Sequence, residues 1–412
     1  MKLALACNNF PPEFNGGTER VVLALAQALI AQGQDVCVMS GSDVAHSGAD
    51  VLEEETKGVQ VLRLPRVPDE GYGLELGRPR LLALAMRLLA ERQVDVLHLH
   101  HWATLSVRTL RAARGAGIGT VATLHDMWTT CPRFFRRPPL GITCPTGRDR
   151  ASCGPCALPS LPTQPVWKLR LGVLDRDRQV RAELAAAGAI TAPSEACAGS
   201  VRRNLPWPGE IEVVPHGLLE APSRAVASPA APSSPPRPMR IGTFGNLVVD
   251  KGVMVLVEAM AGVPDAELHL FGPFLRADFE REVRARAEAL GVALTCHGEF
   301  DPRQRHPARA LDLAVFPSLC EETYGLVVEE ALARGVPVVV SDLGALAERI
   351  GGAGIVTPAG DVAGLRAALG EVAQDASRYA ALRRAIPRTF RTITDAARRY
   401  VELYDAVRKV SP

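Results

Sequence analysis

Residues 313–331 read LAVFPSLCEETYGLVVEEA, an apolar run followed by a polar turn and the start of an amphipathic segment. The apolar run Leu313–Phe316, which ends at a proline and a serine, predicts a short buried strand. A helix is predicted to open near Tyr324–Gly325. Glu322 then lies in the loop at the carboxyl end of the strand, and Glu330 lies about two turns into the helix.

The start of this helix is predicted to bind an anion. The backbone amides of Gly325, Leu326 and Val327 have no helical acceptors and lie at the positive end of the helix dipole. A diphosphate would suit this position, flanked by Glu322 and Glu330, whose carboxylates can accept hydrogen bonds from sugar hydroxyls. The alternative interpretation is a solvated acidic helix start, because carboxylates are favoured there in any case.

The stretch is one part of a longer alternation of apolar and amphipathic runs, which predicts parallel sheets covered by helices. In the first half, a helix is predicted over residues 18–32 with Thr18 as its N-cap, and the predicted strands are Leu3–Cys7, Asp35–Ser40, Val94–Leu99, Thr120–Leu124 and Ala189–Ala192. In the second half, a helix is predicted over Gly252–Ala261, and the predicted strands are Arg240–Phe244, Glu267–Phe271 and Pro337–Ser341. A last amphipathic helix is predicted near Thr392–Lys409.

A linker is predicted between the two halves. Residues 221–238 contain six Pro, five Ala and four Ser, which leave only two Arg and one Val. Such a segment cannot build a core and is partly extended by its prolines. We therefore predict an α/β protein with two doubly wound, Rossmann-like domains, an N-terminal domain over residues 1–220 and a C-terminal domain over residues 239–387.

The composition is that of an ordinary soluble protein, with 47% apolar and 22% charged residues among 412. We expect no secretory signal, because the opening apolar residues run at once into Asn8, Asn9 and two prolines. No uncharged apolar stretch approaches the roughly 18–20 residues that cross a bilayer. The expected location is therefore the cytoplasm, with the nine cysteines mostly reduced.

Positive charge is concentrated in one part of the chain. Residues 101–205 contain 15 Lys and Arg against 6 Asp and Glu, a balance of +9, whereas the whole chain carries +2. This asymmetry predicts an anionic partner for the first half, either a phosphorylated substrate or an acidic membrane surface. The alternative is a set of solvated arginine-rich faces. Nucleic acid is disfavoured, because the arginines are scattered and few aromatic residues lie among them.

Several motifs together resemble one enzyme family. Glu322-Thr-Tyr-Gly-Leu-Val with Glu330-Ala331 is similar to the E-x7-E signature of retaining glycosyltransferases with the GT-B fold, which are family 4-like, group 1 enzymes. The other matching motifs, in the family's order and over nearly the whole chain, are Gly16-Gly17-Thr18-Glu19, Thr123-Leu124-His125-Asp126, Val214-Pro215-His216-Gly217, and Phe244-Gly245-Asn246-Leu247 with Lys251-Gly252.

The resemblance implies a fold and an activity. The two domains would face each other across a cleft, and the C-terminal helix, within residues 388–412, would cross back onto the first domain. The activity would be retaining transfer of a hexosyl residue from a nucleotide-diphosphate sugar to a glycan or lipid-linked acceptor, as in polysaccharide biosynthesis. No metal would be needed, because Lys251 and the helix start near Gly325 would stabilise the leaving group.

The resemblance also assigns roles to single residues. Glu330 would hold the ribose hydroxyls, Glu322 the hydroxyls of the transferred sugar, and His125 would face that sugar. The residues expected to bind the donor are Gly16, Gly17, Asn246, Lys251, Glu322, Tyr324, Gly325, Leu326, Val327 and Glu330, and those expected to be catalytic are His125, Lys251 and Glu322. We interpret His98 and His100 as packing residues.

One position departs from the family pattern. Asn246 stands where the family usually has an arginine, so a positive charge is missing and stabilisation of the leaving group would depend on Lys251. The alternative for Lys251 is a solvated lysine at a helix start, although a lysine there opposes the helix dipole.

A cluster of cysteines forms a second predicted site. Cys131, Cys144, Cys153 and Cys156 lie within 26 residues, and Cys153-Gly-Pro-Cys156 has the spacing of a zinc half-site. The sequence predicts a structural zinc ion that would staple this Pro- and Gly-rich loop. The alternatives are unligated cysteines or disulfides formed by oxidation.

The same loop contains arginines close in sequence to His125. Arg133, Arg136 and Arg137 are predicted to contact an anionic acceptor, such as a glycan linked to a lipid diphosphate. Such an acceptor would bring the protein to the inner face of the plasma membrane as a peripheral protein.

Other functions remain compatible with these motifs. One is a sugar-nucleotide epimerase or a phosphorylase of the same fold, although no acid–base pair for an epimerase is identified. Another is a non-catalytic nucleotide-sugar binder, which the asparagine at position 246 allows.

Overall fold

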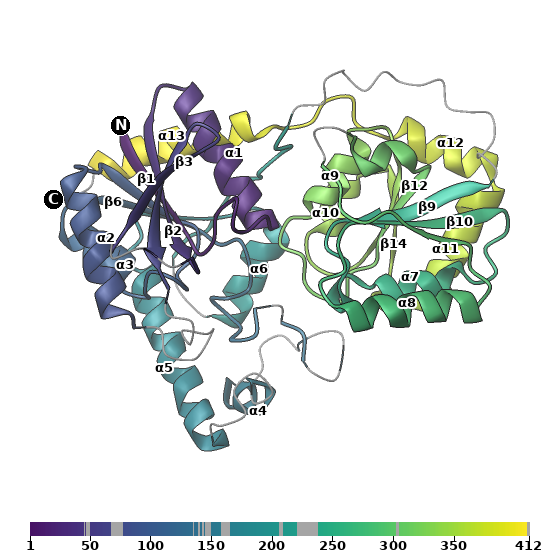
Figure 1. Ribbon diagram of the computed structural model, residues 1–412, viewed down its shortest axis with the longest axis horizontal. Coiled ribbons are helices and arrows are strands. Elements are labelled where there is room, and N and C mark those ends of the chain that lie inside the picture. Colours follow the sequence, from purple (N-terminus) through teal and green to yellow (C-terminus); the bar gives the residue numbers. More distant parts are fainter. Residues whose placement is uncertain are drawn as a thin grey trace. The chain divides into compact units, whose positions relative to one another are not determined.

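The computed structural model describes residues 1–44, 46, 50–66, 77–134, 136–138, 141, 144, 150–157, 165–205, 209–220, 238–301 and 305–409. The chain forms two compact units (Figure 1). Unit 1 contains residues 1–139, 145–220 and 391–412, and unit 2 contains residues 140–144 and 221–390. The chain thus returns to unit 1 at Arg391, close to the predicted position 388. The predicted linker lies outside the described residues, apart from Pro238.

Unit 1 is built on an eight-stranded sheet with the order β3-β4-β2-β1-β5-β6-β7-β8. Its strands are β1 (Lys2–Cys7), β2 (Asp35–Ser42), β3 (Leu52–Thr56), β4 (Val59–Pro65), β5 (Val96–Leu99), β6 (Gly119–Thr123), β7 (Ala189–Ala192) and β8 (Glu212–Val213). All neighbours pair in parallel except β3, which runs antiparallel to β4. Strands β5 and β6 are buried at every position, as expected where helices cover both faces of a parallel sheet.

The helices of unit 1 lie around this sheet. They are α1 (Gly17–Ala31), α2 (Pro79–Glu91), α3 (Thr109–Gly115), α4 (Cys153–Ala157), α5 (Val166–Leu184), α6 (Glu195–Asn204) and α13 (Ile393–Lys409), with the 3-10 helix η1 (Arg150–Ser152). Figure 1 shows α5 extending away from the sheet, with α4 near its far end. No described helix of the chain is long and apolar enough to cross a membrane.

The C-terminal helix is fixed to unit 1 by buried hydrogen bonds. The hydroxyl of Tyr404 lies 2.6 Å from Nδ1 of His98, and the hydroxyl of Tyr400 lies 2.9 Å from Oγ1 of Thr123. All four side chains are buried, and a satisfied polar network in a core specifies one arrangement of its elements. These bonds therefore fix α13 against β5 and β6.

Backbone hydrogen bonds also join the two segments of unit 1 at which the chain leaves it, near Leu218, and returns to it, near Arg391. Leu218 donates its N–H to the carbonyl of Arg391 at 2.9 Å, and Ile393 donates to the carbonyl of Leu218 at 2.9 Å. Gly217 has a φ of +70°, and a Cβ there would lie 2.7 Å from the backbone of Arg391. Only glycine therefore fits this crossing without displacing the returning chain.

Unit 2 is built on a six-stranded parallel sheet with the order β11-β10-β9-β12-β13-β14. Its strands are β9 (Met239–Phe244), β10 (Ala266–Phe271), β11 (Leu294–Cys296), β12 (Leu313–Phe316), β13 (Val338–Ser341) and β14 (Gly354–Thr357). Its helices are α7 (Val253–Met260), α8 (Ala277–Ala289), α9 (Leu326–Leu332), α10 (Leu346–Ile350), α11 (Val362–Gln374) and α12 (Ala376–Arg384), with the 3-10 helices η3 (Val249–Lys251) and η4 (Pro307–Ala310).

Each sheet has one point at which the strand order reverses. In unit 1 this point lies between β1 and β5, and in unit 2 between β9 and β12. Loops leave the carboxyl ends of two such neighbouring strands in opposite directions, which opens a crevice where ligands of doubly wound sheets bind. The loops that follow β9 and β12 contain Lys251 and Glu322, and those that follow β1 and β5 contain Gly16 and His100.

One predicted helix start is wrong. Thr18 was the expected N-cap of the first helix, but α1 begins at Gly17 and Gly16 is its N-cap. An ideal Cβ on Gly16 would lie within contact distance of the Glu19 carboxylate, which folds back toward the helix start. A carboxylate three residues after the N-cap is favoured there because it faces the positive end of the helix dipole.

Candidate active site

Lys251 and Glu322 meet at the strand-order reversal of unit 2. The Nζ atom of Lys251 donates to Oε1 of Glu322 at 2.5 Å, and the hydroxyl of Ser318 donates to the same oxygen at 2.6 Å. The Lys251 side chain is 45% exposed, whereas that of Glu322 is 16% exposed. The site therefore presents a partly exposed lysine next to a carboxylate that accepts hydrogen bonds from two side chains.

The charges of this pair stabilise each other. Desolvation alone would lower the pKa of Lys251, but the neighbouring carboxylate of Glu322 outweighs it, and the pKa of Lys251 is raised. Desolvation alone would raise the pKa of Glu322, but Lys251 and the hydrogen bond from Ser318 outweigh it, and the pKa of Glu322 is lowered. Both groups are therefore charged at neutral pH.

Close backbone contacts bring the two loops together. Gly252, directly after Lys251, has a φ of +71°, and a Cβ on it would lie only 1.9 Å from the carbonyl oxygen of Pro317. The N–H of Leu319 donates to the carbonyl of Asp250 at 2.8 Å. The η3 turn and the loop after β12 thus pack backbone to backbone, which requires the glycine.

A second glycine fixes the backbone of Glu322. The N–H of Ala345 donates to the carbonyl of Glu322 at 2.8 Å, and Gly344 pairs with Glu322 in an isolated parallel bridge. Gly344 has a φ of +70°, and a Cβ on it would lie 2.1 Å from the Glu322 carbonyl oxygen. The position of the carboxylate therefore depends on the segment that follows β13.

Glu330 is buried beside a histidine. Helix α9 begins at Leu326 after Gly325, whose φ of +83° is left-handed. Oε2 of Glu330 lies 3.5 Å from Nε2 of His306, and the two side chains are 10% and 2% exposed. Nδ1 of His306 accepts a hydrogen bond from the N–H of Ala308, so in the neutral ring the proton is on Nε2, which faces Glu330.

Tyr324 contacts Glu329, the residue before Glu330 in α9. Its hydroxyl donates to Oε2 of Glu329 at 2.8 Å, and the guanidinium of Arg349 lies 4.3 Å from the centre of its ring. Tyr324 is only 4% exposed. The structure therefore shows this predicted donor-binding residue buried and in contact with Glu329 and Arg349.

Asn246 lies on the surface after β9. Its side chain is exposed, and it follows Gly245, which has a φ of +119°. Leu326 and Val327, at the start of α9, are partly exposed. The predicted donor-binding residues of unit 2 thus form two groups, one exposed with Asn246 and Lys251 and one buried with Glu330.

In unit 1, three histidine rings lie in contact at the ends of strands. Nδ1 of His100 lies 2.7 Å from Nε2 of His125, and the ring of His216 stacks on that of His125 at 5.0 Å between centroids. All three side chains are buried. Burial lowers the pKa of His100 and that of His125 well below the usual value, so both rings are neutral at neutral pH. One ring must then donate while the other accepts, which couples their tautomers.

A carboxylate lies beside this group. Oδ2 of Asp126 lies 3.3 Å from Nε2 of His101, and Nδ1 of His101 accepts from the N–H of Ala103 at 3.0 Å. Desolvation alone would raise the pKa of Asp126, but the contact with His101 outweighs it and the pKa is lowered. Asp126 therefore stays ionised near the ring of His125.

The arginines of the predicted acceptor loop differ in exposure. Arg136 is 2% exposed and has a φ of +49°, whereas Arg133 and Arg137 are partly exposed. A nitrogen of Arg133 lies 3.5 Å from the carbonyl of Cys156. Burial of Arg136 leaves Arg133 and Arg137 as the more accessible cations of this loop.

The cysteines of the same loop are all reduced. Among the described residues, which include all four predicted ligands, no three His, Cys, Asp or Glu side chains are grouped as the ligands of a metal ion would be. The arrangement of Cys131, Cys144, Cys153 and Cys156 thus gives zinc no geometric support, and the zinc site stays a prediction from spacing.

The chain matches known families over both units. The model of Glycosyltransferase Family 4 matches residues 15–218, and that of Glycosyl transferases group 1 matches residues 238–375. The chain belongs to the GT-B glycosyltransferases. The predicted family and the predicted two-domain fold are both confirmed.

Relatives and solved structures agree with this assignment. The glycosyltransferase is 28% identical to a phosphatidyl-myo-inositol mannosyltransferase of Mycobacterium leprae, over 90% of this chain and 86% of the relative. The fold is similar to that of a sucrose-phosphate synthase from Thermosynechococcus elongatus, with a TM-score of 0.70, 20% identity and 98% of each chain covered. It is also similar to Anabaena HepE in complex with UDP and glucose, with a TM-score of 0.65, 17% identity and 98% and 100% of the chains covered.

Sequence reasoning about the glycosyltransferase missed three side chains near its predicted site residues. These are Ser318, which bonds Glu322, His306, which faces Glu330, and His100, which bonds His125. The available signal for His100 was its place directly after a strand, because His125 follows the neighbouring strand of the same sheet. For Ser318 and His306 no spacing in the sequence indicated the contact, because each depends on how the loops fold.

Proposed function

We propose that this glycosyltransferase transfers a hexosyl residue, with retention of configuration, from a nucleotide-diphosphate sugar to an anionic glycan or lipid-linked acceptor. The observation that carries the proposal is the pair of Lys251 and Glu322, held by Ser318 where the strand order of unit 2 reverses. An exposed cation and a carboxylate held by two hydrogen bonds at this edge suit a diphosphate bound next to a sugar.

The departing diphosphate develops negative charge as the glycosidic bond to the sugar breaks. Lys251 would donate to an oxygen of that diphosphate, because its side chain is 45% exposed and its ammonium group stays protonated. A bound diphosphate would thus compete with Glu322 for Lys251. The carboxylate released from this contact, still held by Ser318, would accept hydrogen bonds from hydroxyls of the transferred sugar.

Two further groups would complete donor binding. The Glu330 carboxylate, one oxygen of which lies 3.5 Å from Nε2 of His306, would accept bonds from the ribose hydroxyls. The amides of Leu326 and Val327 would add donors to the diphosphate. This set supplies positive charge and donors without a divalent cation, and we propose that the reaction needs none.

His125 would act on the sugar as a neutral hydrogen-bonding group. Burial lowers its pKa, and His100 fixes one of its ring nitrogens. We propose a positioning role for His100, which acts through His125.

The acceptor is proposed to be anionic and lipid-linked. The mycobacterial relative is named for a phosphatidyl-inositol substrate, and residues 101–205 of this chain are strongly basic. The cations proposed to receive the acceptor are Arg133 and Arg137, because the third predicted contact, Arg136, is buried. Replacement of Arg133 and Arg137 by glutamate should lower acceptor use, and unchanged acceptor use would contradict this part of the proposal. A lipid-linked acceptor would bring the enzyme to the inner face of the plasma membrane.

Incubation of the chain with UDP-, GDP- and ADP-sugars, with nucleotide release followed in the presence of EDTA, tests the donor. Slow hydrolysis of one sugar nucleotide is the expected result, and it should survive EDTA. Once an acceptor is found, NMR of the product should show the same anomeric configuration as in the donor. Interconversion of two sugar nucleotides without an acceptor would instead indicate an epimerase, and binding without turnover would indicate a non-catalytic binder.

A further inference from the structure

Helix α5 presents three large apolar side chains to solvent. Trp167, Leu171 and Leu174 are 65%, 60% and 50% exposed. Their spacing of four and three residues places them in one stripe along the helix. The opposite side of α5 is buried through residues such as Leu169 and Val173, so the stripe is the outward face of a helix that is already packed.

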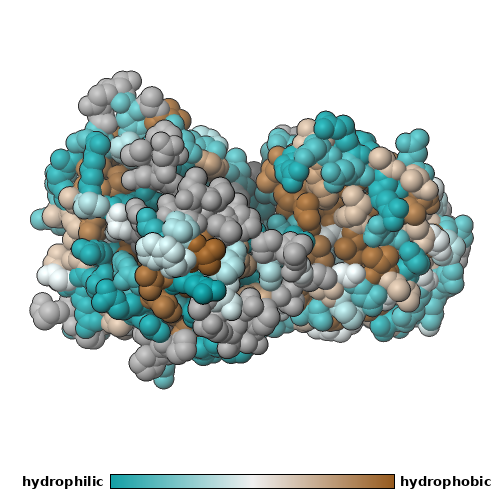
Figure 2. Space-filling model, turned by 90° about the horizontal axis from the view of Figure 1, so that it is seen from below, coloured by the Kyte–Doolittle hydropathy of each residue, from teal (hydrophilic) through white to brown (hydrophobic). Residues whose placement is uncertain are grey.

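Figure 2 views the molecule from the side toward which α5 extends in Figure 1. On this side of unit 1, brown apolar atoms lie among teal hydrophilic ones. Scattered apolar residues on a surface are ordinary, but a contiguous stripe with a tryptophan at one end indicates a binding surface.

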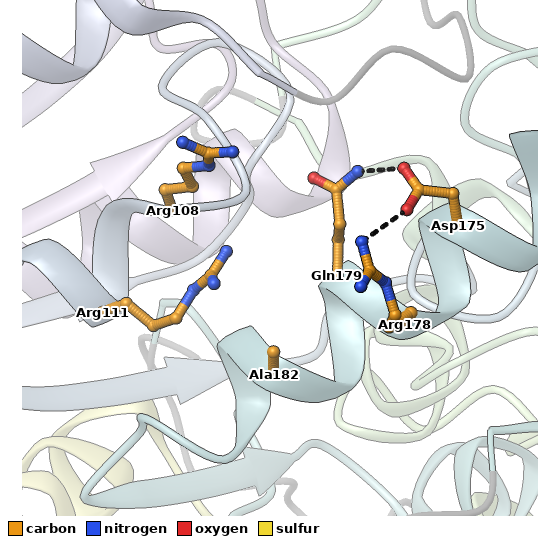
Figure 3. A pocket seen from close by; sticks show the side chains of 6 residues that line it. All are labelled: Arg108, Arg111, Asp175, Arg178, Gln179 and Ala182. Carbon is orange, nitrogen blue, oxygen red and sulfur yellow. Dashed lines mark hydrogen bonds and ion pairs between the residues drawn. The ribbon is translucent and has the colours of Figure 1, made fainter.

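A basic pocket continues the stripe. Arg178 lies one helical turn beyond Leu174 on the same face, and it lines a pocket of about 370 Å³ between α3 and α5. Figure 3 shows the guanidinium groups of Arg108 and Arg111 extending from the α3 side toward the residues of α5. Three arginines from two elements therefore surround one open space.

The charge of this pocket is only partly neutralised. Arg178 pairs with Asp175 at 3.1 Å, and Arg111 pairs with the buried Glu183 at 3.2 Å. Gln179 also bonds Asp175. The side chain of Arg108 makes no hydrogen bond or ion pair within the described part of the chain, so the pocket keeps an uncompensated positive charge.

Exposed positive charge also exceeds exposed negative charge along the rest of α5. Lys168, Arg170 and Arg181 lie on either side of the stripe, and the first two are exposed. Of the carboxylates on this helix, Glu183 and Asp177 are buried, and Asp177 pairs with Arg150 at 2.6 Å. Asp175 is thus the one exposed acid on α5, against several exposed cations.

We infer that the outward face of α5, together with the pocket of Arg108, Arg111 and Arg178, docks onto a bilayer surface that carries anionic headgroups. Tryptophan and leucine enter the boundary between headgroups and acyl chains, while arginines beside them attract anionic lipid. A free anion would use the pocket but would not require the apolar stripe. Of the two anionic partners predicted for residues 101–205, the inference therefore selects the acidic membrane surface. This inference names the membrane contact of the proposed function, but it rests on the α5 surface and not on the transfer reaction.

Sedimentation with vesicles tests the inference without donor or acceptor. The full chain is mixed with vesicles of phosphatidylcholine alone or with added phosphatidylglycerol. Binding should require the anionic lipid, and it should weaken as salt is raised, because the arginine contacts are screened. If the chain does not bind phosphatidylglycerol vesicles, the inference is wrong, whatever the transferase assays give.

Two sets of variants separate the stripe from the charge. Combined replacement of Trp167, Leu171 and Leu174 by serine should weaken vesicle binding at least about tenfold, since each side chain loses apolar contact with lipid. Leu275→Ser is the matched control, because Leu275 is 61% exposed on unit 2. An equal loss of vesicle binding in this control would contradict a specific role for α5.

Arg178→Glu combined with Arg108→Glu should also weaken binding, by about tenfold or more at low salt. Arg398→Glu is the matched control, because Arg398 pairs with Asp395 at the same spacing and is similarly exposed. Both α5 variants should retain donor hydrolysis, which shows that they are folded. Inorganic phosphate at millimolar concentration should not displace the vesicles. If it does, and the stripe variant binds vesicles as the wild type does, the pocket recognises a phosphate group alone and the apolar stripe has no part in docking, which contradicts the inference.

Fluorescence gives a second readout. Of the tryptophans in the described part of the chain, Trp167 is exposed whereas Trp102 and Trp128 are buried, so anionic vesicles should shift the emission to the blue through Trp167. Trp167→Phe should remove the shift while vesicle sedimentation persists. A shift that remains in this variant would mean that another part of the chain meets the lipid.

Discussion

Nζ of Lys251 and Oε1 of Glu322 lie 2.5 Å apart although 71 residues separate them in the chain. The contact exists because β9 and β12 are neighbours in the sheet, so the loops that follow them leave from the same edge. Gly252 then allows the loop after β9 to approach the loop after β12, and Gly344 allows the segment after β13 to approach Glu322, backbone to backbone. The cation and the carboxylate are thus positioned by sheet order and by two glycines.

Lys251→Ala should lower kcat by about 10²- to 10³-fold, the usual cost of removing one donor to a developing charge. Binding of the donor should weaken less, because the other groups of the site remain. The measurement is nucleotide release at saturating sugar nucleotide. Lys409→Ala, which removes an exposed lysine at the end of α13, is the control and should change nothing. Full activity of Lys251→Ala would contradict the proposed role.

Asn246→Arg should raise activity. The residue is exposed beside the site and supplies no charge, so an arginine would add a second cation for the leaving diphosphate. We expect kcat/KM to increase up to about tenfold, with a steeper dependence on salt. If the variant loses activity while remaining folded, Asn246 contacts the donor in a way that an arginine cannot reproduce.

Gly344→Ala should lower the free energy of unfolding of unit 2 and displace Glu322. The new methyl group would overlap the Glu322 carbonyl and would also strain a φ of +70°. Gly262→Ala is a matched control, because Gly262 has a φ of +84° but no atom within 4 Å of its Cβ position. The control should cost about 1–2 kcal/mol from backbone strain alone. Urea unfolding should show that Gly344→Ala lowers the free energy of unfolding by roughly 1–3 kcal/mol more than Gly262→Ala does. Equal losses in the two variants would contradict the close approach of Gly344 to Glu322.

Acid should destabilise unit 1 through its buried histidines. The folded pKa values of His98, His100 and His125 lie below 6.5, chiefly because of burial. The unfolded chain therefore binds protons first as pH falls, and stability that is present above pH 6.5 is lost below it. Each histidine contributes a slope of about 1.4 kcal/mol per pH unit in this range. His100→Asn should reduce the slope measured by urea unfolding between neutral pH and about pH 5 by that amount. An unchanged slope would show that folding does not lower the pKa of His100.

Tyr404→Phe should destabilise unit 1 without changing its fold. The hydroxyl lost from this position bonds the buried Nδ1 of His98, which would then lack a partner. Removal of one partner of a buried hydrogen bond costs about 1–3 kcal/mol. The free energy of unfolding measures this cost, and circular dichroism checks that the helix content is kept. A variant as stable as the wild type would mean that water replaces the hydroxyl.

The sequence predicted the central strands of both sheets and the family because these depend on local patterns, but it did not predict the strands toward the sheet edges, namely β3, β4, β8, β11 and β14. Apolar runs such as Leu313–Phe316 are strands in the structure because both faces are covered. Element ends were less well predicted, as the start of α1 at Gly17 in place of Thr18 shows, since caps depend on side chains that fold back. The antiparallel β3–β4 pair was not predicted, because pairing between neighbouring strands leaves little trace in the composition of either.

The sequence by itself determined which residue types follow each strand, namely a lysine after β9, two glutamates around the start of α9, and histidines after β5 and β6. Only the tertiary structure decided which of them touch. It joined Lys251 to Glu322, turned Tyr324 toward Glu329 and left the four cysteines ungrouped within the described residues. It also exposed Trp167 on a helix whose other face is buried. Periodicity fixes the face of an element, whereas contacts between side chains depend on strand order and loop closure, which no local pattern contains.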